Sequence, residues 1–226
     1  MPGYRTKQER ISIAGVDDLV IRSLLDRQQF SDRDGAAERL GISSAAWPLF
    51  GLLWPSGVLL AARLGARPVT AGEKILEIGC GLALASLVGH RRGADVTASD
   101  RHPLTALFLA ENLRLNGLLP MKYLHGDWDE SGDAADAGGF DFIVGSDLLY
   151  ERDAGGALAR FISRHAKASC EVWIVDPDRS NRPAFNRRMA ADGIVRSEER
   201  LDAVATACDA AYRGRLLVYR RKLAPH

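Results

Sequence analysis

Glycines, acids and aromatic residues follow several apolar runs in the middle of this chain, and these residue types suit a nucleotide-like ligand. The apolar run at 74–79 ends in Gly79 and is followed by Cys80 and Gly81. Two glycines one residue apart let a ligand approach the backbone closely at the start of a helix. Leu84 stands where a dinucleotide-binding fingerprint has its third glycine, which disfavours pyrophosphate binding. A tight turn without a ligand is the alternative interpretation.

Two further acids follow apolar runs downstream of this turn. Asp100 lies 21 residues after Gly79, a spacing at which an acid accepts hydrogen bonds from ribose hydroxyls in nucleotide-binding folds. Its alternative role is that of a helix N-cap. Asp127 and Trp128 end the next run, where a carboxylate can meet the amino group of an adenine and an indole can offer its face. For Trp128 the alternative is an ordinary core aromatic.

The segment Ser146-Asp147-Leu-Leu-Tyr150 closes a fourth apolar run. An acid and a phenol three residues apart, at the end of a buried strand, suit the reacting part of a ligand. We predict Asp147 and Tyr150 to be catalytic. The alternatives are a helix cap for Asp147 and an edge of the core for Tyr150.

Strands and helices alternate along the region that must position these residues. Strands are predicted at 74–79, 94–100, within 121–128, and at 140–147, 170–176, 194–200 and 214–221. Helices are predicted at about 56–64, 82–94, 102–117, 155–166 and 183–192, with Pro103 in the first turn of the third. This alternation predicts an α/β, Rossmann-like doubly wound sheet of seven strands. The sheet is expected to be mostly parallel with an antiparallel edge hairpin, because no crossover helix separates the last two strands.

The first part of the chain is harder to interpret. Residues 11–15 and 19–25 fit either a hairpin or a strand followed by a helix. We therefore predict an N-terminal extension over 1–45 and a ligand-binding domain over 46–226.

Composition excludes several classes of protein. The chain has 226 residues, with 30 Lys and Arg against 29 Asp and Glu, so it lacks the basic excess of a dedicated nucleic-acid binder. Three cysteines are too few for a disulfide scaffold, and the five histidines show no metal-ligand spacing, so no metal site is expected. A cytoplasmic setting is expected, since no signal peptide is apparent.

An uncharged stretch between Arg39 and Arg63 raises the question of a membrane span. Pro48 and Pro55 would break such a helix twice. The expectation is therefore a buried segment and then a helix that begins near Trp54-Pro55, with no membrane association.

Taken together, the strand ends resemble a class I, seven-strand S-adenosylmethionine-dependent methyltransferase. More narrowly, they resemble its protein-lysine methyltransferase-like group. The resemblance covers about 45–180 and comprises these motifs: Leu53-Trp54-Pro55, LEIGCG (76–81), Asp100, Asn112 with Asn116, Trp128, and Asp147-x-x-Tyr150. It implies S-adenosylmethionine as cofactor, bound by Trp54, Gly79, Cys80, Gly81, Asp100, Trp128 and Ser146. We add Asp127 from its position beside Trp128.

The resemblance also implies the reaction, a methyl transfer to the lysine side chain of a protein substrate. A small-molecule acceptor on the same fold is the nearest alternative. A nicotinamide-dependent oxidoreductase and a non-catalytic cofactor-binding protein are further alternatives. Separately, we expect a monomer, because no segment is typical of a coiled coil. The arginines at 179, 182, 187 and 188 are interpreted as a solvated face rather than as a surface for an acidic partner protein or a phosphate.

Overall fold

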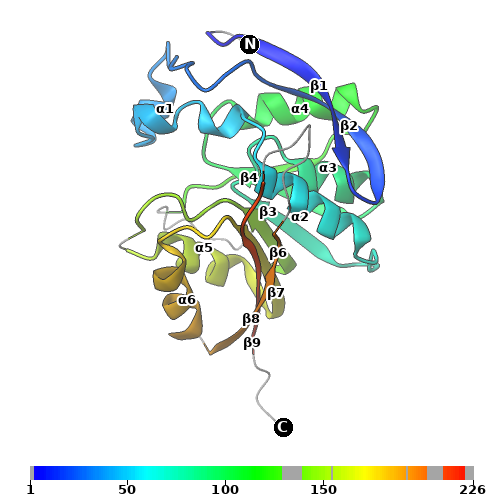
Figure 1. Cartoon of the computed structure of the whole chain (residues 1–226), viewed down its shortest axis with the longest axis vertical. Coiled ribbons are helices and arrows are strands. Elements are labelled where there is room, and N and C mark those ends of the chain that lie inside the picture. The colour runs from blue at the N-terminus through cyan, green and yellow to red at the C-terminus, as the bar shows by residue number, and fades with distance from the viewer. Residues whose placement is uncertain (1–2, 129–138, 154, 192, 203–210, 222–226) are drawn as a thin grey trace.

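A seven-stranded, mostly parallel sheet forms the centre of the molecule (Figure 1). The computed structural model describes residues 3–128, 139–153, 155–191, 193–202 and 211–221. The strands are β3 (Lys74–Ile78), β4 (Asp95–Asp100), β5 (Lys122–His125), β6 (Phe140–Ser146), β7 (Ala166–Asp176), β8 (Ile194–Arg200) and β9 (Arg215–Arg221). Their order across the sheet is β5-β4-β3-β6-β7-β9-β8.

The strands β3 to β7 run parallel, whereas β9 is antiparallel to both β7 and β8. The predicted fold class, including its antiparallel edge hairpin, is confirmed. The small-residue segment 131–139, whose composition predicts a surface loop, lies almost wholly outside the described residues.

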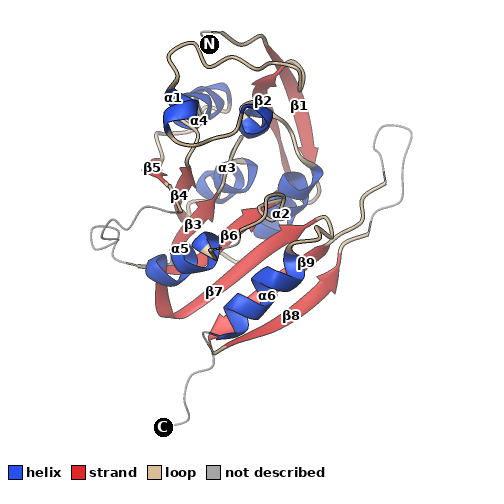
Figure 2. Ribbon diagram, turned by 90° about the vertical axis from the view of Figure 1, so that its left-hand side faces the viewer, coloured by secondary structure: helices blue, strands red, loops and turns tan. Residues whose placement is uncertain are grey.

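Helices cover both faces of the sheet (Figure 2). They are α2 (Pro55–Ala66), α3 (Leu84–Arg91), α4 (Thr105–Leu115), α5 (Ala157–His165) and α6 (Arg182–Ala191). The short helix α1 (Ala36–Arg39) packs in a separate cluster, in which Ala37 contacts Ile42 and Ala46. On β3, Ile75 packs into a cluster with α2, α3 and α4, while Leu76 and Ile78 pack with α5 and α6. Burial on both faces explains why this strand reads as a continuous apolar run.

Three helices begin later than the sequence predicts, one of them α5, which starts at Ala157 instead of 155. Helix α3 starts at Leu84, because Gly79, Gly81 and Ala83 all have positive φ angles, of 56°, 51° and 59°. A chain in this conformation cannot enter a right-handed helix before the last of these residues. Helix α4 starts at Thr105, so Pro103 precedes the helix rather than occupying its first turn.

The N-terminal segment forms a hairpin, which settles the alternatives left open for it. Strands β1 (Thr6–Ile13) and β2 (Val16–Leu24) pair antiparallel and lie beside α4 (Figure 1). The backbone N–H of Val20 donates to Oδ1 of Asn116 at 2.9 Å. Apolar hairpin residues, Leu19 among them, belong to the same core cluster as α2, α3 and α4. The hairpin of the predicted extension is thus packed on helices of the main sheet.

The stretch Ser44–Ala66 is apolar and long enough for a membrane span by length and composition alone. The structure divides it into two short 3₁₀ helices, η1 (Ser44–Ala46) and η2 (Leu49–Gly51), followed by α2. With 12 residues, α2 extends for about 18 Å, short of the roughly 30 Å hydrocarbon core of a bilayer. Its inward face buries Leu60 and Leu64 in the core, and Pro55 begins it as the sequence predicts.

Candidate active site

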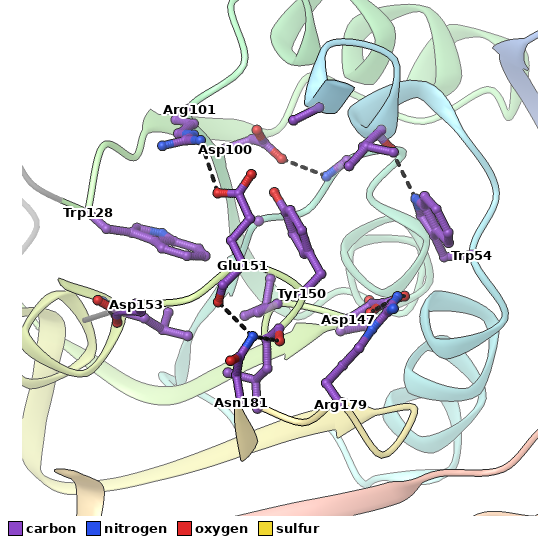
Figure 3. A pocket seen from close by; sticks show the side chains of 18 of the residues that line it. Trp54, Asp100, Arg101, Trp128, Asp147, Tyr150, Glu151, Asp153, Arg179 and Asn181 are labelled. Carbon is purple, nitrogen blue, oxygen red and sulfur yellow. Dashed lines mark hydrogen bonds and ion pairs between the residues drawn. The ribbon is translucent and has the colours of Figure 1, made fainter. Parts of the chain in front are cut away.

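A cleft of about 1040 Å³ opens at the carboxyl ends of the parallel strands (Figure 3). This is the edge at which ligands bind in open α/β sheets. Nine of the ten predicted site residues line it: Trp54, Gly79, Cys80, Gly81, Asp100, Trp128, Ser146, Asp147 and Tyr150. Asp127 is not among the lining residues, although its neighbour Trp128 is. The volume lies at the upper end of the usual range for ligand pockets.

The glycine turn presents backbone to the cleft. The N–H of Gly81 donates to Oδ2 of Asp100 at 2.9 Å, which ties the turn to the end of β4. A side chain at Gly81 would place its Cβ 2.9 Å from the carbonyl oxygen of Phe50, too close for any residue but glycine. Burial raises the pKa of the Cys80 thiol well above its usual value, so this side chain stays protonated and inert.

Asp100 organises the neighbouring wall. Its second oxygen, Oδ1, accepts the N–H of His102 at 2.8 Å. Burial raises the pKa of the carboxyl, and these two backbone donors oppose that rise. A carboxylate offers about four lone-pair sites. Backbone donors, to which Arg101 also contributes, use up to three of these sites, and the remaining acceptor capacity is available to ribose hydroxyls.

His102 and Phe50 form part of the same wall, and the sequence analysis did not identify either as a cleft residue. Their rings stack with centroids 3.8 Å apart and an interplanar angle of 11°. Burial lowers the pKa of His102 to about 4, so the imidazole is neutral near pH 7. Phe50 also makes edge contacts with Tyr4 and Phe108. These contacts link the N-terminal segment to the cleft.

Two indoles lie on opposite sides of the cleft in the view of Figure 3. Trp54 precedes α2, and its Nε1–H donates to the carbonyl oxygen of Leu49 at 3.0 Å. Trp128 follows β5, and its carbonyl oxygen accepts a hydrogen bond from Arg164 at 3.3 Å. The Trp54 ring is therefore fixed by its own N–H, whereas Arg164 fixes the backbone of Trp128.

Glu77 lies beneath the glycine turn and is only 2% exposed. Its Oε2 accepts the backbone N–H of Ser86 at 2.7 Å, which fixes the start of α3. Burial raises the pKa of this carboxyl to about 7. An acid within a buried strand was the available sequence signal, since buried charges need partners.

Asp147 adopts a left-handed conformation with a φ of 53°, rare for a residue other than glycine. Its N–H donates to the carbonyl oxygen of Val175 at 2.8 Å, which anchors the turn after β6 to β7. Its carboxylate pairs with Arg179, from Nε to Oδ1 at 2.8 Å and from Nη2 to Oδ2 at 3.0 Å. The interpretation of Arg179 as part of a solvated face is therefore wrong. The strand ends of β6 and β7 are adjacent, so their following turns meet.

Tyr150 lies near the middle of the cleft in Figure 3, with 42% of its surface exposed. The turn that carries it is held by Asn181, whose amide donates to the carbonyl oxygens of Leu149 at 2.9 Å and Glu151 at 3.0 Å. Glu151 also lies 3.8 Å from Arg101 across the opening. The phenol is thus accessible while its backbone is fixed.

Comparison with known proteins assigns this site to a family. Residues 48–187 match the sequence profile described as lysine methyltransferase. The electron transfer flavoprotein beta subunit lysine methyltransferase of Danio rerio is 28% identical over 144 residues, which cover 62% of this chain and 54% of that protein. The protein N-lysine methyltransferase METTL21A of Danio rerio is 27% identical over 141 residues, 61% of this chain and 62% of that protein. The chain thus spans less than two thirds of these relatives' length.

Solved structures share the fold. The Thermus thermophilus 16S rRNA N2 G1207 methyltransferase, solved with AdoMet and guanosine, superposes with a TM-score of 0.61 at 20% identity. The superposition covers 98% of this chain and 52% of that one. At this identity the likeness supports the fold alone.

The donor set of the cleft fits S-adenosylmethionine. The close approach of backbone at Gly81 suits the cofactor's amino-acid portion, the free lone pairs of Asp100 suit its ribose hydroxyls, and Trp128 offers a ring face for its adenine. Together with the matched family profile, this sheet, its glycine turn and its strand-end acids show that the chain belongs to the lysine methyltransferase family, whose cofactor is S-adenosylmethionine.

Proposed function

We propose that this protein transfers a methyl group from S-adenosylmethionine to the lysine side chain of a protein substrate. The observation that carries the proposal is the continuity of the cleft. A single cavity in a member of the lysine methyltransferase family joins the glycine turn and Asp100 to Asp147 and Tyr150. A cofactor bound at the glycine turn and Asp100 points its reactive end toward Asp147 and Tyr150.

S-adenosylmethionine supplies a methyl group activated by its positively charged sulfur. The acceptor nitrogen must present a lone pair in line with the methyl carbon, and most of the catalysis is positioning. The lone pairs of Asp147 that Arg179 leaves free accept N–H bonds from this nitrogen. Tyr150 lines the approach and directs its hydroxyl to the same atom. The apolar side chains of Leu148 and Leu149, also in the lining, help to exclude water.

We also propose a setting for the reaction. A protein substrate is supported by the named activities of the relatives above. A cytoplasmic location is supported by Cys80 and Cys170, which are both free thiols and buried. We further propose a monomer that binds neither nucleic acid nor membrane, in keeping with the balanced charge of the chain.

Labelled-methyl transfer into a soluble protein extract tests the proposal. The labelled proteins are hydrolysed, and methyllysine is separated from methylhistidine, methylarginine and small labelled products. We expect methyllysine, and we expect Asp147→Asn to abolish its formation while S-adenosylmethionine still binds. Asp95→Asn, on the exposed opposite end of β4, is the matched control and should retain activity. Label in small molecules alone, or in another amino acid, would refute lysine as the acceptor.

A further inference from the structure

The carboxylate assigned to the acceptor is already paired with a cation of the chain itself. Asp147 is 11% exposed at its side chain, and Arg179 engages both of its oxygens with two parallel hydrogen bonds. The backbone N–H of Arg179 donates to Oδ2 of Asp176 at 2.9 Å, which anchors the arginine at the end of β7. Asp147 and Arg179 thus form a bidentate ion pair, and the backbone of each residue is itself fixed by a hydrogen bond. This distinguishes the pair from a chance contact between two surface side chains.

Other ionisable groups near this pair come from three elements. Asp176 ends β7, Tyr150 follows β6, and Tyr212 precedes β9. Partial removal from water raises the pKa of both phenols to about 12, so neither carries charge near neutrality. The Asp176 carboxyl is fully buried, which raises its pKa to about 6 and leaves it mostly ionised above pH 7.

Three neighbouring arginines are engaged elsewhere. Arg182, Arg200 and Arg215 all pair with Asp178. Among the residues that the structure describes, Arg179 is therefore the cation that contacts Asp147.

The pairing with Arg179 changes the net charge that the acceptor nitrogen encounters at Asp147. An unpaired carboxylate would favour a lysine in its charged ammonium form, which has no lone pair and cannot attack a methyl group. A carboxylate neutralised by a guanidinium still accepts an N–H bond, yet it gives the ammonium little added stabilisation. The uncharged amine is the nucleophile, so neutralisation favours the reactive form.

We propose that Arg179 is a positioning residue that neutralises Asp147, so that the site receives the acceptor nitrogen as an uncharged amine. The inference rests on the proposed function. In the step it supports, the amine lone pair forms the N–C bond and the C–S bond breaks. The electron pair of that bond stays on sulfur, and the methylated nitrogen then releases its extra proton to water.

The pH dependence of methyl transfer into the protein extract tests this role. Initial rates are measured from pH 7 to 10 at low extract concentration and saturating cofactor, where Asp176 stays ionised throughout. For Arg179→Gln we expect the rising limb of the profile to move up by about one pH unit, since an opposite charge at contact distance shifts a pKa by one or more units. Arg179→Lys, which keeps the charge, should restore the position of the limb.

Arg182→Gln is the matched control. It removes a neighbouring positive charge that pairs with Asp178 and is not in the cleft lining, so the profile should not move. A rise in rate by the same factor at every pH in Arg179→Gln would instead identify Arg179 as a steric block and overturn the inference. An unmoved profile would overturn it as well.

A binding measurement keeps the inference testable even if lysine is not the acceptor. The probe is n-butylammonium, titrated at pH 7 into the protein saturated with S-adenosylhomocysteine. Arg179→Gln should bind it about tenfold more tightly than the unaltered protein, the affinity equivalent of one pKa unit. Equal or weaker binding contradicts neutralisation. Absence of methyllysine with tighter binding refutes only the proposed function.

Discussion

The side-chain amide of Asn112 on α4 forms hydrogen bonds with both backbone groups of Arg22 on β2. The N–H of Arg22 donates to Oδ1 at 2.8 Å, and Nδ2 donates to the carbonyl oxygen of Arg22 at 3.4 Å. Asn112 is fully buried, and its amide pairs with the β2 backbone as a neighbouring strand would. The hairpin in turn packs Leu24 against Gly51, next to the Phe50 that lies over the glycine turn. A residue far from the cleft thereby supports its wall.

Replacing Asn112 should loosen this hairpin. Asn112→Ala leaves both backbone groups of Arg22 without their partner, at a cost of about 1–3 kcal/mol in the free energy of unfolding. Hydrogen exchange should accelerate at Val20 and Arg22, and urea denaturation should report the loss of stability. Arg114→Ala, on an exposed face of the same helix, is the control and should leave both measurements nearly unchanged. Unaltered exchange in Asn112→Ala would show that apolar packing alone holds the hairpin.

A methyl group at Gly81 should damage the cofactor site. Gly81→Ala combines a φ of 51° with a Cβ only 2.9 Å from the Phe50 carbonyl oxygen, so the turn or the wall must shift. We expect at least a tenfold loss of S-adenosylmethionine affinity by calorimetry. Gly117→Ala has a similar φ of 64° but nothing within 4 Å of its Cβ, so it tests conformational strain alone. Equal affinity in the two variants would contradict a role for the Phe50 contact.

The carboxylate of Asp100 should matter for the same binding step. In Asp100→Asn, one carboxylate oxygen becomes an NH₂ group that faces the N–H of Gly81 or of His102, and a donor then opposes a donor. Losing one charge-assisted hydrogen bond costs about 1.5–3 kcal/mol, so S-adenosylmethionine should bind roughly 10- to 100-fold more weakly. Asp95→Asn on the same strand serves as the control for a change of charge. Unchanged affinity in Asp100→Asn would remove this residue from the cofactor site.

Glu77 should make stability fall as the pH rises. Its pKa lies near 7 in the folded protein, above the ordinary 4.5, because burial disfavours the charged form. The folded state therefore holds this proton more tightly than the unfolded state, and the associated stability is lost between about pH 4.5 and pH 7. Glu77→Gln should gain stability relative to the unaltered protein as the pH rises from 5 to 8, by up to about 3 kcal/mol.

Thermal denaturation at several pH values measures this difference. Glu9→Gln on the exposed face of β1 is the control and should give a difference that is constant with pH. A flat difference for Glu77→Gln as well would mean that the Glu77 carboxyl titrates near its ordinary pKa in the folded protein.

Local patterns in the sequence were sufficient to predict the sheet and the residues at its strand ends. Strands buried on both faces, such as β3, read as short apolar runs, and each ends in a residue that parallel topology must bring to the same edge. For this reason the positions of Gly79, Asp100, Trp128 and Asp147 in one cleft followed from spacing alone. The starts of α3 and α4 did not follow from spacing, because positive φ angles at Gly79, Gly81 and Ala83, and a proline that precedes α4 instead of beginning it, leave weak signals in composition.

The tertiary structure decided the contacts between segments that are distant in the chain. Arg179 meets Asp147 because the turns after β6 and β7 lie side by side, and Asn112 meets Arg22 because the hairpin lies on α4. These residues are 32 and 90 positions apart, and neither pairing leaves a periodic or local trace in the sequence. The sequence by itself determined which chemistry gathers at the strand ends. Only the folded structure determined that Asp147 is paired with the positive charge of Arg179, because electrostatic partners depend on proximity in space.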